Sequence, residues 1–178
     1  MSIIRVHDKE FDLYIPQDQI ERAIKKVADD INRDMAGKNP LFLVVLNGAF
    51  MFAAELFKSL EIDCEISFVK LSSYAGTKST NVIRELIGLD YSVSGRNVVL
   101  VEDIVDSGLT INYTMGKLKK LEAKSVTVAT MLFKPKAFRF NFEVEYIGIE
   151  IPDEFIIGYG LDYNEHARNL PDIYKVVS

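Results

Sequence analysis

The hydrophobic positions of the chain follow two patterns, one typical of amphipathic helices and one typical of strands buried on both faces. After Pro16, isoleucine and valine recur three or four residues apart up to Ile31, and a glycine and a proline follow before residue 41. Comparable stretches predict helices over residues 50–60 and 110–121. Short apolar or β-branched runs predict strands, which cover residues 41–46, 65–71, 97–101, 125–133, 146–149 and 155–159.

The order of these elements predicts the fold class. Strands that alternate with helices, with nearly continuous apolar runs, indicate an α/β protein with a central, mostly parallel twisted sheet flanked by helices. No repeat, low-complexity tract or linker divides the sequence, so one domain is expected over residues 1–178. In open sheets of this kind ligands bind beyond the carboxyl ends of the strands, and the polar residues at those ends are therefore the candidates for chemistry.

The composition of the chain limits the kinds of partner that it is expected to bind. The chain has 178 residues, a hydrophobic fraction of 48% and a net charge of −5, which gives no support for general binding to nucleic acid or to an anionic membrane. Cys64 is the single cysteine, and the first residues lack the pattern of a signal peptide, so a cytoplasmic location is expected. His7 and His166 have no companions for a metal site or a catalytic triad, and both are interpreted as structural or surface residues.

The most informative segment is residues 98–110. Four apolar strand residues end in Glu102 and Asp103, and Asp106 precedes a Ser-Gly-Leu-Thr entry into the next helix. Gly108 permits a tight turn, Thr110 is a candidate helix cap, and the free amides at a helix start bind phosphate. The carboxylates suit a sugar diol or a Mg²⁺ ion that arrives with the ligand. Together these features predict a site for a phosphorylated sugar.

This segment closely resembles the phosphoribosyl-pyrophosphate signature of the type I phosphoribosyltransferases. The resemblance implies that Glu102 and Asp103 hold the ribose hydroxyls, and that Asp106 also faces the imidazole nitrogen of a purine as the acid/base group. It assigns the 5′-phosphate to Asp106, Ser107, Gly108, Leu109 and Thr110. It further implies Mg²⁺ as cofactor, with Glu102, Asp103 and Asp162 as the candidate metal residues.

The residues that indicate which base accepts the ribose phosphate lie later in the chain, after residue 130. Taken alone, Lys134 after a predicted strand is more often a solvated lysine, and Phe155 before a strand is more often a core residue. The stretch from Glu150 to Glu165, however, looks very like the hypoxanthine–guanine phosphoribosyltransferases, whose resemblance then covers nearly the whole chain. It implies a 6-oxopurine substrate and a small base-binding hood. In that reading the base-binding residues are Lys134 at the 6-oxo group, Phe155 stacked on the ring, and Ile156 and Asp162 at its edge.

Two further loops follow from the same resemblance. The turn Leu46-Asn47-Gly48, together with Arg168, corresponds to the binding site for pyrophosphate, although many family members carry lysine where this chain has Asn47. The polar stretch from residue 72 to residue 80, including Ser73 and Tyr74, resembles a mobile lid. Enzymes of this family usually form dimers or tetramers, so a homodimer or homotetramer is expected.

Three alternatives remain at this point. In the first, the chain is an enzyme for another base, such as xanthine or a pyrimidine. In the second, it is a regulator that senses phosphoribosyl pyrophosphate and binds nucleic acid. The acidic balance argues against the regulator. A receiver-like signalling domain with an acidic pocket ranks last, because the Ser-Gly-Leu-Thr helix entry has no role there.

Overall fold

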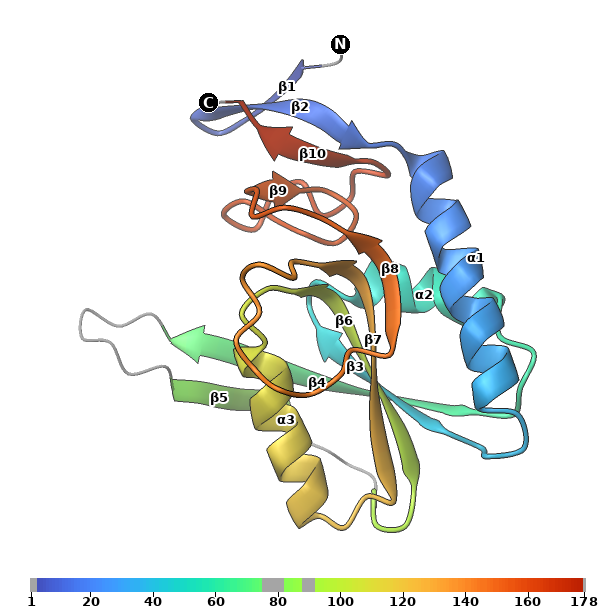
Figure 1. Cartoon of the computed structure of the whole chain (residues 1–178). Helices are drawn as coiled ribbons and strands as arrows, with labels where there is room; N and C mark the ends of the chain where they lie inside the picture. Colours follow the sequence, from blue (N-terminus) through green and yellow to red (C-terminus); the bar gives the residue numbers. More distant parts are fainter. Residues whose placement is uncertain (1–2, 75–81, 88–91, 178) are drawn as a thin grey trace.

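The structure is a computed structural model that describes residues 3–74, 82–87 and 92–177, with side chains outside residues 72–91. In chain order its elements are β1 (Ile3–Val6), β2 (Lys9–Ile15), α1 (Gln17–Asp34), β3 (Leu41–Leu46), α2 (Phe50–Lys58), β4 (Glu65–Tyr74), β5 (Val82–Ile87), β6 (Asn97–Val105), α3 (Leu109–Lys120), β7 (Ser125–Phe133), β8 (Tyr146–Glu150), β9 (Ile156–Ile157) and β10 (Ile173–Val176). They build two sheets (Figure 1).

The larger sheet has six strands in the order β5-β4-β3-β6-β7-β8. The five strands from β4 to β8 in that order run parallel, and β5 pairs antiparallel with β4 at one edge. Alternate residues of β3 enter two different cores: Phe42 packs with α1 and α2, whereas Leu43 packs with Ile111 and Leu118 of α3. Helices thus cover both faces, which explains the continuous apolar run of β3. The predicted fold class is confirmed.

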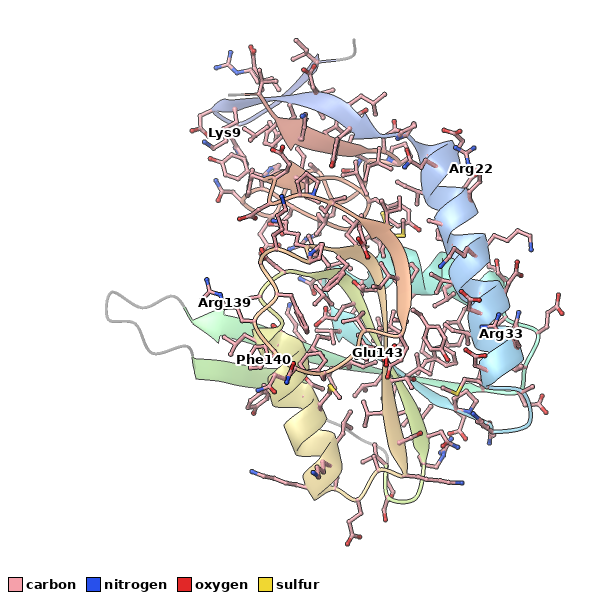
Figure 2. All side chains as sticks on the ribbon, in the orientation of Figure 1. Lys9, Arg22, Arg33, Arg139, Phe140 and Glu143 are labelled. Carbon is pink, nitrogen blue, oxygen red and sulfur yellow. The ribbon has the colours of Figure 1, made fainter. Side chains whose placement is uncertain are left out.

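Helix α1 has one apolar and one charged face. Ile20, Ile24, Val27 and Ile31 are buried at the predicted helical spacing, and Arg22 and Arg33 project from the opposite side (Figure 2). The apolar face packs against the sheet and the charged face meets solvent, so burial of this one face determines the orientation of the helix. No helix within the described ranges combines the length and the apolar character needed to span a bilayer.

The smaller sheet corresponds to the expected hood and joins the two ends of the described chain. Its order is β1-β2-β10-β9, with antiparallel pairing throughout. Phe11 of β2 is fully buried and packs with Ile157 of β9 and Tyr174 of β10. The sequence pattern did not predict β1, β2, β5 or β10, and the pairing of β10 with β2 joins opposite ends of the chain. In Figure 1 this sheet lies beyond the carboxyl ends of the central strands.

Four predicted strands have different bounds, since β4 and β8 also extend past their predicted ends. Strand β6 continues to Val105, four residues past the predicted end, because its neighbour β7 offers a ladder as far as Phe133. Strand β9 spans only Ile156–Ile157, because the chain turns through positive φ angles at Gly158 and Tyr159.

The two histidines lie on the surface, as predicted, and contact each other. His7 is in the turn between β1 and β2, and its Nε2 atom lies 2.9 Å from Nδ1 of His166. The contact ties the amino-terminal hairpin to the loop that precedes β10.

Candidate active site

Residues from four separate segments line one pocket of about 230 Å³ at the carboxyl end of the central sheet. Five of the predicted site residues meet there, and they are Leu46, Gly48, Glu102, Asp103 and Thr110. The two carboxylates lie within the last part of β6 and not after it, which corrects the expected strand end. The strand ladder therefore fixes their backbone before any ligand arrives.

Burial dominates the electrostatics of the two carboxylates. Glu102 is 6% exposed, and its pKa is raised well above the ordinary range, first by burial and then by the charge of Asp103. The pKa of Asp103 is raised to about 6, mainly by burial; a hydrogen bond from the Ile104 amide and the charge of Arg168 act in the opposite direction. The pocket thus holds two acids whose ionisation becomes favourable when a cation or hydrogen-bond donors enter.

The turn after β6 leads directly into α3. Gly108 has a φ of 83° and is the residue that caps the helix, so the prediction that Thr110 is the cap was wrong. Thr110 lies in the first turn of the helix instead, at the edge of the pocket. A side chain at Gly108 would meet the ring of Phe138, because the loop after β7 lies over this turn. The Ser107 hydroxyl accepts a 3.4 Å hydrogen bond from the Leu109 amide. The other amides at a helix start have no partner within the helix and are suited to bind an anion.

Three backbone segments meet behind the carboxylates without room for side chains. A Cβ atom at Gly48 would fall on the carboxylate of Asp103, and one at Gly160 would fall on the carbonyl oxygen of Gly48. The peptide bond between Leu46 and Asn47 is cis. Glycine at residues 48 and 160 is therefore needed for the close approach of β6, the loop after β3 and the loop after β9.

Lys134 is buried and held between two carboxylates. Its Nζ atom lies 3.3 Å from Asp106 and 3.0 Å from Asp153, although only 7% of the residue is exposed. The surface-lysine interpretation is therefore wrong for this residue, whereas Lys136 is exposed. Sequence reasoning gave Asp153 no role. Its one available signal was its position shortly after the end of β8, at the same edge of the sheet as the other site residues.

The remaining base-binding candidates lie at the hood. Phe155 is 46% exposed, and its ring centroid lies 5.7 Å from that of Tyr163 and 6.2 Å from that of Phe11. The ring is thus fixed by aromatic neighbours while part of it stays open to solvent. Ile156 is buried in β9, where it pairs with Lys175.

Arg168 and Asp162 form an ion pair beside the pocket. The Nη2 atom of Arg168 lies 2.7 Å from Asp162, and Nη1 donates a 2.9 Å hydrogen bond to the carbonyl of Gly160. Both charges influence the pKa of Asp103. The structure therefore brings Arg168 and Asp162 to the side of the pocket where Gly48 and Gly160 touch.

Two of the candidate metal residues, Glu102 and Asp103, line the same pocket, whereas Asp162 is paired with Arg168. Over the residues that the structure describes, no group of three or more His, Cys, Asp or Glu side chains is placed to hold an ion. The two pocket carboxylates fit Mg²⁺, which commonly binds through one or two carboxylates together with substrate phosphates and water.

The lid prediction falls largely outside the described residues. Ser73 and Tyr74 form the end of β4, where their backbones pair with Ile83 and Val82 of β5, and residues 75–80 are not described.

Comparison with known proteins gives one consistent family. The model of the phosphoribosyl transferase domain matches residues 15–164. The hypoxanthine-guanine phosphoribosyltransferase of Streptococcus pneumoniae is 41% identical over 160 residues, which cover 89% of both chains. A crystal structure of a hypoxanthine-guanine phosphoribosyltransferase from Bacillus anthracis is 39% identical, with a TM-score of 0.88 and coverage of 93% of this chain and 98% of that one.

A longer relative matches as well. The bifunctional protein TilS/HprT of Listeria monocytogenes is 39% identical over 160 residues, and the matched region spans 89% of this chain but 25% of that protein.

The raised pKa of Asp103 predicts a pH-dependent change in stability. Because the pKa rises from 3.8 to about 6 on folding, the folded state binds more protons between these values, and stability is lost as the pH rises through this window. Asp103→Asn removes that loss. We therefore compare the free energy of unfolding of the variant with that of the unmodified protein. The difference, variant minus unmodified, is expected to increase by up to about 3 kcal/mol from pH 4 to pH 7.

Urea denaturation at intervals between pH 4 and pH 8 measures this difference. The same exchange at the exposed Asp63 is the matched control, for which we expect little change across the series. A difference for Asp103→Asn that stays constant with pH would contradict the account of the buried carboxylate.

Proposed function

This chain belongs to the phosphoribosyl transferase domain family, and we propose that it is a purine salvage enzyme. It transfers the 5-phosphoribosyl group of phosphoribosyl pyrophosphate to hypoxanthine or guanine, and the products are the nucleoside monophosphate and pyrophosphate. The single observation that carries the proposal is the pocket in which Glu102 and Asp103 meet the start of α3 and Gly48. Its carboxylates suit ribose hydroxyls, and the helix start suits the 5′-phosphate.

The ribose phosphate is held mainly by backbone and by buried acids. The amides at the start of α3, from Ser107 to Thr110, bind the 5′-phosphate together with the helix dipole. Glu102 and Asp103 accept hydrogen bonds from the ribose hydroxyls, which lowers the cost of ionising both acids in the apolar end of β6. Mg²⁺ bound with the ligand would neutralise charge on the pyrophosphate as it leaves.

The base is selected by the pair formed by Lys134 and Asp106. A 6-oxopurine presents the 6-oxo group and the N7 atom on the same edge. Nζ of Lys134 lies 3.3 Å from Asp106, so one side chain can donate to the oxygen while the other accepts the proton of N7. An adenine would place its 6-amino group, itself a donor, against the ammonium of Lys134. Phe155 stacks on the ring, and the backbone of Ile156 and the nearby Asp162 lie at its edge.

The reaction exchanges one bond at the anomeric carbon. The N9 atom of the purine forms the new bond to the ribose, and the bond to pyrophosphate breaks with its electron pair on the leaving oxygen. The proton on N7 then moves to the carboxylate of Asp106, which Lys134 holds in place. Arg168 and the loop at Leu46, Asn47 and Gly48 bind the departing pyrophosphate, for which a guanidinium is well suited.

The wider setting of the enzyme is part of the proposal. We propose one phosphoribosyltransferase domain over residues 1–178, a cytoplasmic location, and assembly into a homodimer or homotetramer. A solved structure of the Trypanosoma cruzi hypoxanthine phosphoribosyl transferase is 31% identical, with a TM-score of 0.87. It concerns the role of the C-terminal region in the oligomeric state and activity of that enzyme.

Asp106→Asn tests the proton transfer. The amide retains the shape of the side chain but cannot take the proton of N7, so we expect kcat for nucleotide formation to fall by roughly 10²–10⁴-fold. Steady-state assays with hypoxanthine measure the change, and Asp63→Asn is the control. Turnover close to that of the unmodified enzyme would remove Asp106 from the acid/base role.

Lys134→Ala tests the choice of base. We expect the ratio of kcat/KM for hypoxanthine over adenine to fall by about tenfold or more, because a charged hydrogen bond to the 6-oxo group is lost. Lys136→Ala, which removes an exposed lysine two residues away, should leave the ratio unchanged. An unaltered ratio in Lys134→Ala would reject its assignment as the selector.

A further inference from the structure

A partly buried hydrogen bond joins α2 to the loop after β9. The hydroxyl of Tyr159 donates to Oε2 of Glu55 across 3.0 Å. Tyr159 is 3% exposed and has a φ of 48°, so the loop is held in one unusual backbone conformation around it. Burial and the neighbouring Glu55 raise the pKa of Tyr159, and its hydroxyl therefore stays a donor at physiological pH.

The residues joined by this bond are direct neighbours of the pyrophosphate end of the site. Gly160, the next residue after Tyr159, touches the carbonyl oxygen of Gly48 and leaves no space for a side chain. Gly48 lies in the turn that leads into α2, the helix that carries Glu55. The loop and the helix are thus in contact at one end through two glycines and at the other through the tyrosine and the glutamate.

Arg168 depends on the same loop. The Gly160 amide donates to the Arg168 carbonyl over 2.9 Å, and the Arg168 guanidinium donates to the Gly160 carbonyl over 2.9 Å. A shift of Gly160 away from Gly48 would therefore change the separation between Arg168 and the turn at residue 48, the two groups that are proposed to bind pyrophosphate.

We propose that Tyr159 and Glu55 are positioning residues that hold the two halves of the pyrophosphate site, Gly48 and Arg168, at their working separation. The proposal rests on the proposed function. Neither side chain lines the pocket, so both act through the backbone of Gly160 and through α2. Loss of the bond should weaken the ligand that carries pyrophosphate and spare a ligand that lacks it.

Equilibrium binding tests this directly. Isothermal titration calorimetry with Mg²⁺ present should show that Tyr159→Phe raises the Kd for phosphoribosyl pyrophosphate by about three- to tenfold, the effect expected of one hydrogen bond. The Kd for inosine monophosphate, which has the ribose phosphate and the base but no pyrophosphate, should stay within about twofold.

Two exchanges at the partner residue refine the test. Glu55→Gln keeps an oxygen that accepts from the tyrosine, and we expect the Kd for phosphoribosyl pyrophosphate of the unmodified protein. Glu55→Leu removes the acceptor and should reproduce Tyr159→Phe. Tyr174→Phe is the matched control, because it also removes a tyrosine hydroxyl bonded to a carboxylate, at 3.4 Å from Asp172 in the hood, and should not change this Kd.

Several outcomes would overturn the inference. An unchanged Kd for phosphoribosyl pyrophosphate in both Tyr159→Phe and Glu55→Leu would do so, as would equal weakening of phosphoribosyl pyrophosphate and inosine monophosphate. If the unmodified protein binds phosphoribosyl pyrophosphate but forms no nucleotide with any purine, the proposed function fails while the same Kd values still decide the positioning role. Absence of binding by the unmodified protein would overturn both.

Discussion

The burial of Glu102 and Asp103 at the end of β6 is the constraint on which the rest of the site depends. Burial raises the pKa of both acids, so the ionised form of each carries an electrostatic penalty. The strand ladder to β7 prevents the backbone from moving these groups into water. A ligand that brings hydroxyl groups and a divalent cation would remove this penalty, which supports the proposed binding of a phosphorylated sugar by a site made of acids.

The rest of the pocket is arranged around these acids by close backbone contact. Gly48 lies against the carboxylate of Asp103 and Gly160 lies against the carbonyl oxygen of Gly48, so the chain segments at the ends of β6, β3 and β9 approach one another closely. The base end is built differently, from the buried ammonium of Lys134 between Asp106 and Asp153. In the proposed function, backbone amides together with Glu102, Asp103 and Arg168 hold the sugar and the diphosphate, whereas Lys134 and Asp106 distinguish the base.

The sequence predicted those features that local pattern determines. The spacing of Ile20, Ile24, Val27 and Ile31 defined the buried face of α1, and the run 41–46 defined a doubly covered strand. Features that depend on distant partners were missed. Strand β10 pairs with β2 from the opposite end of the chain, and the contact between Tyr159 and Glu55 joins residues 104 positions apart. Most site roles came from family resemblance, since composition and spacing alone favoured a solvated Lys134 and a core Phe155.

The most direct measurement is nucleotide and pyrophosphate formation by the purified chain with phosphoribosyl pyrophosphate, Mg²⁺ and, separately, hypoxanthine, guanine, xanthine and adenine. We predict rapid formation of inosine or guanosine monophosphate, equimolar release of pyrophosphate, and no reaction with adenine. No product with any base, although phosphoribosyl pyrophosphate binds, would contradict the central claim that this pocket joins an oxopurine to a ribose phosphate.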